Sequence, residues 1–151
     1  MSDSSSTERL AELLSARHRT LGKLRVVSAR QIQVLQRDAI GELHELLAVK
    51  QTLIEDLVRV DQAIDPYRAE DPERRVWSSP DVRERCRQLV EECTRWLDEV
   101  KEFEAGAERL ARERMETTSR EMETHVDRSR AVAAYLRTDR NVPAGRVVRE
   151  G

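Results

Sequence analysis

The sequence has few of the residues that build compact mixed folds. Among its 151 residues there are two tryptophans, two tyrosines and one phenylalanine, with five glycines and four prolines, whereas charged residues make up 37%. A composition so poor in aromatic residues and so rich in charge, with sustained apolar periodicity, is typical of long helices. We therefore expect an all-α protein with about one domain, over residues 1–151.

Three further absences restrict the function. No run of about eighteen apolar residues occurs, so no transmembrane helix is expected. The first ten residues, MSDSSSTERL, lack the basic and apolar regions of a secretory signal, so the expected location is the cytoplasm. The 27 basic and 29 acidic residues are interleaved and give a net charge of −2, which disfavours nucleic-acid binding because phosphate backbones require a basic surface.

Cysteine is also scarce, and the two cysteines, Cys86 and Cys93, stand seven residues apart on one expected helix. At that separation they are too far apart to bridge each other. We expect two small buried thiols, with a disulfide across a dimer interface as the alternative.

Three of the four prolines lie between Pro66 and Pro80. Because proline lacks a backbone N–H and clashes with the preceding turn, a helix through this segment is disfavoured. The expected architecture is a long antiparallel helical hairpin that resembles a coiled coil. Its C-terminal helix can be broken. Self-association or a partner can complete the hairpin to a bundle. Its expected parts are a disordered lead-in (1–4), a first helix (5–65), a tip (66–79), a second helix (80–137) and a flexible tail (138–151).

Helix-start signals support both helices. Ser5 and Glu8 fit a capping box at the start of the first helix. Ser79 is suited to be the N-cap of the second helix, with Pro80 in its first position and Asp81 beside the positive end of the helix dipole.

Apolar residues recur along both helices at alternating steps of four and three, as in coiled coils. Between Leu35 and Leu43 two steps of four follow each other, which is a slip in the heptad. Since Gly41 lies within this slip, the sequence predicts local unwinding or a mild bend there.

The apolar content falls with distance from the Pro66–Pro80 tip. Over residues 111–130 the only sizeable apolar side chains are Met115, Met122 and Val126. Because burial of apolar surface supplies about 25 cal/mol per Å², we expect a firm half near the tip and a fraying or partner-dependent half beyond it.

Residue patterns for catalysis are missing. None of the three histidines, His18, His44 and His125, follows a glutamate by three residues, as a di-metal carboxylate bundle requires. The sequence has no glycine-rich phosphate loop and no nucleophile-elbow motif. We therefore expect no enzyme and no catalytic, cofactor-binding or metal-binding residues.

Two segments are candidates for contacts. At the tip, Tyr67, Arg74, Arg75 and Trp77 would either anchor a partner or fold back to seal the end of the helical pair. Near the C-terminus, the amphipathic segment 126–136 would either bind a partner helix or cap the end of the bundle. The candidate partner-binding residues of this segment are Val126, Val132, Ala133, Tyr135 and Leu136.

The run LQRDAIGELHELLAVKQTLIEDL resembles the FlgN-like flagellar export chaperones, which carry an aspartate, then Leu-x-x-Leu-Leu, a lysine, and Leu-Ile-x-x-Leu. The matching positions are Asp38, Leu43, Leu46, Leu47, Lys50, Leu53, Ile54 and Leu57. The resemblance covers about a third of the chain and extends loosely to the whole hairpin.

This resemblance implies a cytoplasmic, non-enzymatic chaperone. Such proteins bind the C-terminal helices of hook–filament junction subunits, prevent their premature assembly and present them to the export gate. The substrate-binding segment of the family would correspond to Val126–Leu136. The family also engages the export-gate platform through a C-terminal tyrosine; Tyr135 is the available one, within AVAAYLR rather than in a glycine-containing tail.

The alternative is a structural coiled-coil adaptor. Ile40, Leu47 and Ile54 add a second row to the apolar stripe, and a wide stripe packs against more than one neighbour. The chain would then self-associate through this row, so both a monomer and a homodimer are consistent with the sequence.

Overall fold

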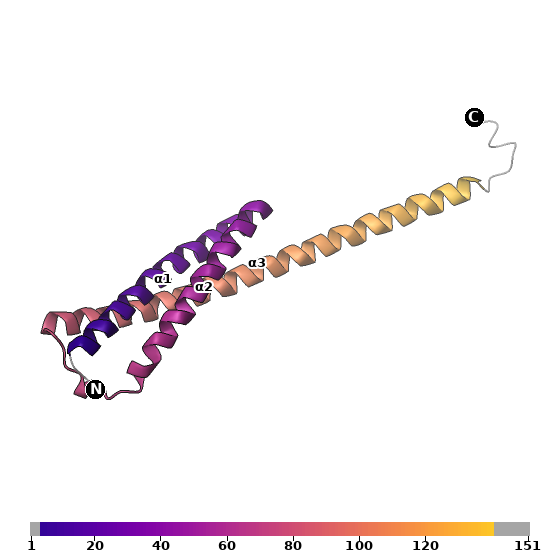
Figure 1. Cartoon of the computed structure of the whole chain (residues 1–151). Helices are drawn as coiled ribbons and strands as arrows, with labels where there is room; N and C mark the ends of the chain where they lie inside the picture. The colour runs from indigo at the N-terminus through magenta and orange to yellow at the C-terminus, as the bar shows by residue number, and fades with distance from the viewer. Residues whose placement is uncertain (1–3, 141–151) are drawn as a thin grey trace. The chain divides into compact units, whose positions relative to one another are not determined.

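A computed structural model describes the backbone of residues 4–140 and the side chains of residues 4–137. Its elements, in chain order, are α1 (Ser4–Arg37), α2 (Ile40–Arg68), the short 3-10 helix η1 (Pro72–Arg74) and α3 (Pro80–Arg140) (Figure 1). No strand occurs within residues 4–140, which confirms the all-α prediction. Residues 1–3 of the expected lead-in and 141–151 of the expected tail lie outside the described residues.

The chain divides into two units. The bundle unit is Met1–Leu110 and the C-terminal unit is Ala111–Gly151. The bundle unit holds α1, α2, η1 and the first part of α3, and the rest of α3 belongs to the C-terminal unit. Each unit is described by itself below.

A chain reversal at Asp38 separates α1 from α2, so the prediction of one helix over 5–65 was wrong. Asp38 has a φ of 60°, in the left-handed region. Its N–H donates to the carbonyl of Leu35 at 3.4 Å, and the N–H of Ala39 donates to the carbonyl of Val34 at 3.3 Å. These two bonds form the Schellman motif, which satisfies the last carbonyls of a helix and ends it. The slip in the heptad thus marks a full reversal instead of a mild bend.

Other helix boundaries differ by a few residues. Pro66 lies inside α2, close to its end at Arg68, where the missing proline N–H removes only one bond of the last turns. Ser5 lies inside α1, because the helix already begins at the preceding residue. At the far end α3 continues to Arg140, since no proline or glycine interrupts residues 138–140.

The predicted start of the helix after the tip is confirmed. Helix α3 begins at Pro80, and the Ser79 hydroxyl accepts a hydrogen bond from the Val82 N–H at 3.2 Å. This bond satisfies one of the donors that the first turn of a helix leaves without a partner.

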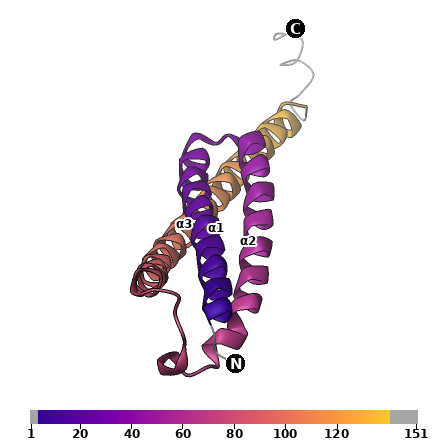
Figure 2. The same cartoon turned by 60° about the vertical axis from the view of Figure 1, so that its left-hand side comes forward.

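In the bundle unit α1 runs antiparallel to α2 and parallel to α3. Polar pairs join α1 to α2 at Arg30–Glu42, Gln31–Lys50 and Arg17–Asp61. Polar pairs join α1 to α3 at His18–Glu92, Arg25–Glu99 and Ser28–Glu104. The separation along the sequence grows from 12 to 44 residues in the first set, but stays between 74 and 76 in the second. Figures 1 and 2 show α1 and α2 side by side, joined by a tight turn. The helix that completes this hairpin to a bundle therefore comes from the same chain.

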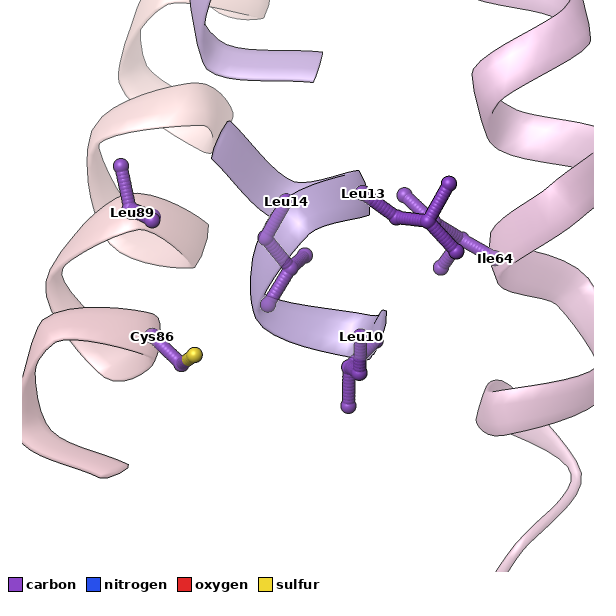
Figure 3. Close-up of a cluster of buried hydrophobic side chains, with 6 residues drawn as sticks. All are labelled: Leu10, Leu13, Leu14, Ile64, Cys86 and Leu89. Carbon is purple, nitrogen blue, oxygen red and sulfur yellow. The ribbon is translucent and has the colours of Figure 1, made fainter. Parts of the chain in front are cut away.

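The core of the bundle unit consists of two apolar clusters. The first comprises Leu10, Leu13, Leu14, Ile64, Cys86 and Leu89 (Figure 3). In this cluster Leu13 lies toward Ile64 of α2, whereas Leu14 lies on the side of α3. The second comprises Leu21, Leu24, Leu53, Cys93 and Val100. Helix α1 thus supplies core residues to both of its neighbours, a role that the two-helix prediction had not assigned to it.

A nearly buried lysine joins all three helices. Lys50 of α2 is only 8% exposed. Its ammonium donates to the Gln31 side chain of α1 at 2.9 Å and forms an ion pair with Glu104 of α3. The Glu104 carboxylate also accepts from the Ser28 hydroxyl at 3.4 Å. Because a buried charge is costly unless it is paired, these partners make Lys50 compatible with the interior.

The Asp38 reversal predicts a contrast between two neighbouring substitutions. A β-branched residue is strained at a φ of 60°, so Asp38→Val should lower the free energy of unfolding by about 1–2 kcal/mol. Gly41→Ala should raise it by up to about 1 kcal/mol, because a Cβ at Gly41 meets nothing within 4 Å. Urea denaturation followed by circular dichroism measures both. A larger loss for Gly41→Ala would show that the reversal depends on the glycine instead.

The ion pair between Lys50 and Glu104 predicts that substitutions of its two members differ in their effect on stability. Glu104→Ala leaves a buried ammonium with one partner fewer and should lower the free energy of unfolding by about 1–3 kcal/mol. Lys50→Met removes the buried charge, while the Glu104 side chain, 43% exposed, can be solvated by water; the change should stay within about 1 kcal/mol. Equilibrium denaturation measures the free energy of unfolding of both variants. A larger loss for Lys50→Met than for Glu104→Ala would contradict the prediction.

Candidate helix-binding surface

His18 is held by structural contacts in the bundle unit. Its ring stacks on Trp96 with centroids 4.3 Å apart, and its Nε2 lies 2.8 Å from the carboxylate of Glu92. The hydrogen bond from His18 lowers the pKa of the Glu92 carboxyl. Arg25 lies over the same indole, 5.0 Å from the ring centroid, and a Cβ on Gly22 would lie 3.2 Å from the indole Cζ3. Trp96 thus packs closely across α1, and His18 takes part in this packing.

The two cysteines are buried free thiols, as predicted. Burial is the main cause that raises the pKa of both Cys86 and Cys93. Because the thiolate is the nucleophilic and metal-binding form, a raised pKa makes both side chains less reactive. Within the described part of the chain, no three His, Cys, Asp or Glu side chains come together in a way that could hold a metal ion.

The aromatic residues of the tip pack inward. Tyr67 and Trp77 are partly buried against the first apolar cluster. The Arg75 guanidinium donates to the Tyr67 carbonyl at 2.5 Å, and the buried Thr7 hydroxyl donates to the Val76 carbonyl at 2.6 Å. These contacts agree with the alternative in which the tip seals the end of the bundle.

The predicted partner-binding residues all lie on the exposed surface of α3 in the C-terminal unit. They are Val126, Val132, Ala133, Tyr135 and Leu136, and each of them is exposed. Every described side chain from residue 115 to residue 137 is exposed. The apolar residues of this region therefore do not serve as a core.

Six of these exposed side chains form one face, which we call the α3 stripe. It comprises Met115, Met122, Val126, Val132, Ala133 and Leu136. At about 100° per residue, these positions fall within an arc of about 120°. Tyr135 lies about 60° beyond Val132 on the helix surface, outside the stripe. The sequence prediction omitted Met115 and Met122, although their spacing of seven residues would have placed them on the same face.

Basic residues border the stripe toward the C-terminal end of α3. A shallow hollow in the surface is lined by His125, Arg128, Ser129, Val132, Ala133 and Leu136. Arg130 and Arg137 follow on the other side of the stripe by helical spacing. An apolar face with basic borders is complementary to an amphipathic helix that carries acidic side chains beside its apolar face.

Exposure of the stripe predicts that it contributes little to folding. Val132→Ser and Leu136→Ser should each change the free energy of unfolding by no more than about 0.5 kcal/mol. Leu89→Ala, at a side chain only 2% exposed, should lower it by about 2–5 kcal/mol. Thermal and urea unfolding of the three variants provides the comparison, and a core-sized loss from Val132→Ser would show that the stripe is part of the core.

Within residues 4–140, no helix is long and apolar enough to cross a membrane. Comparison with known proteins finds no matching family model, no similar curated protein and no similar solved structure.

Proposed function

We propose that this chain is a non-enzymatic binding protein that captures an amphipathic helix of a partner protein on the α3 stripe. The observation that carries the proposal is the stripe itself: six apolar side chains on one helix face, all exposed. An exposed apolar face with polar borders marks an interaction site, and apolar residues at steps of three, four and seven suit helix-to-helix recognition.

The composition of the stripe fits the capture of a mobile partner. Met115 and Met122 are 72% and 63% exposed, and the flexible methionine side chain adapts to surfaces of different shape. A partner segment that becomes helical on binding loses about 2–5 kcal/mol of the interaction energy to ordering. The expected complex is therefore of modest affinity and readily reversible, which suits a protein that must later release its partner.

The specific partner class comes from the resemblance to the FlgN-like export chaperones. In this form of the proposal, the chain acts in the cytoplasm on the C-terminal helices of hook–filament junction subunits and prevents their premature assembly. Contact with the export gate would use Tyr135, which is 70% exposed.

Three residues of that resemblance have structural roles in the bundle unit. Asp38 stands at the chain reversal, Lys50 joins the three helices and Leu53 lies in the second apolar cluster. These positions of the pattern thus have a physical explanation in the fold of this chain. The chaperone activity itself is inferred from the resemblance together with the stripe.

Titration calorimetry with synthetic C-terminal helices of junction subunits tests this function. The full chain should bind at least one such peptide, and a Val132→Asp/Leu136→Asp double variant should bind it at least tenfold more weakly, because two carboxylates would be buried against an apolar face. The matched control is Thr117→Asp/Thr124→Asp, which adds the same charge to exposed positions outside the stripe. This control should change the affinity by no more than about twofold.

Two outcomes would contradict the proposal. If the stripe variant bound as tightly as the original chain, the stripe would not be the binding surface. If no junction-subunit peptide bound, the chaperone form would be wrong. Binding of an unrelated acidic amphipathic helix in that case would retain helix capture as the activity while changing the partner class.

A further inference from the structure

The outer face of α2 carries a second exposed apolar row, in the bundle unit. Ile40, Leu47, Ile54 and Val58 are 69%, 41%, 37% and 48% exposed. At about 100° per residue, these four positions fall within an arc of about 40°. We call this set the α2 row. It is separate from the α3 stripe, which belongs to the other unit.

The α2 row is additional to the face that α2 uses for the core. The buried residues of this helix are Lys50, Leu53 and Ile64. By helical spacing, Leu53 lies about 100° and Ile64 about 80° from Ile54, the nearest member of the row, whereas Lys50 lies about 40° from it. Helix α2 therefore has one wide apolar face, and the α2 row is the part of it that stays exposed within the bundle unit.

The spacing of the row indicates what kind of surface would cover it. Ile40, Leu47 and Ile54 recur at intervals of seven residues. A row with this period stays on one side of a helix that winds slightly around a second helix, as in a coiled coil. A helix with the same spacing is thus a geometrically matched partner, and α2 of a second copy has that spacing.

Polar side chains along the row fit an antiparallel pair. His44 and Glu55 lie on the same border of the α2 row, within about 20° of each other around the helix. If Leu47 of one copy stands opposite Ile54 of the other, each His44 comes beside Glu55 of the other copy, and twofold symmetry forms this contact twice. A parallel pair in register would instead leave each His44 about 16 Å along the helix axis from Glu55 of the other copy, so this contact would not form.

We infer that the α2 row is a contact surface between two copies of this chain, paired antiparallel through α2. The contact uses four apolar side chains per copy and lies at the small end of protein interfaces, so the dimer should be weak, with a Kd on the order of 10–100 µM. The inference goes beyond the proposed helix capture, since it concerns a different surface and a different partner.

Sedimentation velocity over a range of protein concentrations tests the dimer. The full chain should shift from monomer to dimer as its concentration rises through the expected Kd, whereas a Leu47→Glu/Ile54→Glu variant should remain monomeric. Val26→Glu is the matched control, because Val26 is an exposed apolar residue of α1, outside the row, at 68% exposure. It should leave the dimer unchanged, and circular dichroism well below the expected Kd should show the same helicity for all three proteins.

Disulfide trapping tests the antiparallel direction. Gln51 lies close to the expected twofold axis, because the Leu47–Ile54 alignment brings each Gln51 near its own copy. Gln51→Cys should therefore form a covalent dimer under mild oxidation, whereas His44→Cys should not. In a parallel dimer both variants would form the disulfide to the same extent, and this result would contradict the antiparallel arrangement. A chain that stays monomeric at all concentrations would overturn the inference, and the peptide titration with the α3 stripe variants would be unaffected by that result.

Discussion

The architecture of the bundle unit depends on the backbone reversal at Asp38. The left-handed conformation of this one residue, with φ at 60°, ends α1 and turns α2 back along it. Only then can Lys50 and Leu53 of α2 reach α1 and α3. A continuous helix through this point would leave the buried face of α1 with α3 alone as its neighbour. The reversal therefore converts a two-helix pair into a three-helix bundle.

Much of this fold follows from strong local signals. Ser79 and Pro80 define the start of α3 because their capping chemistry is specific. The reversal at Asp38 could not be predicted in the same way, because aspartate is an uncommon residue at a left-handed helix end and the apolar period continues across it with only a slip. Gly41, the residue that the sequence pattern favoured as the weak point, lies within α2.

The candidate surface could be predicted in part. Val126, Val132 and Leu136 follow from amphipathic spacing, and their exposure agrees with the expectation of a partner-dependent region. The role of Lys50 could not be found this way, since a lysine in an apolar row is ordinarily solvated. Its partners come from two other helices, and such contacts become visible only when the order of the helices in space is known.

The packing of Trp96 against Gly22 has a consequence for mechanics. The indole fits where α1 lacks a side chain, and a Cβ there would lie only 3.2 Å from it. Sliding α3 along α1 by one turn, about 5.4 Å, would bring this ring against a residue with a side chain. The packing of Trp96 against Gly22 therefore fixes the position of α3 along the axis of α1. Within the bundle unit, an axial displacement of α3 along α1 would therefore be opposed at this layer.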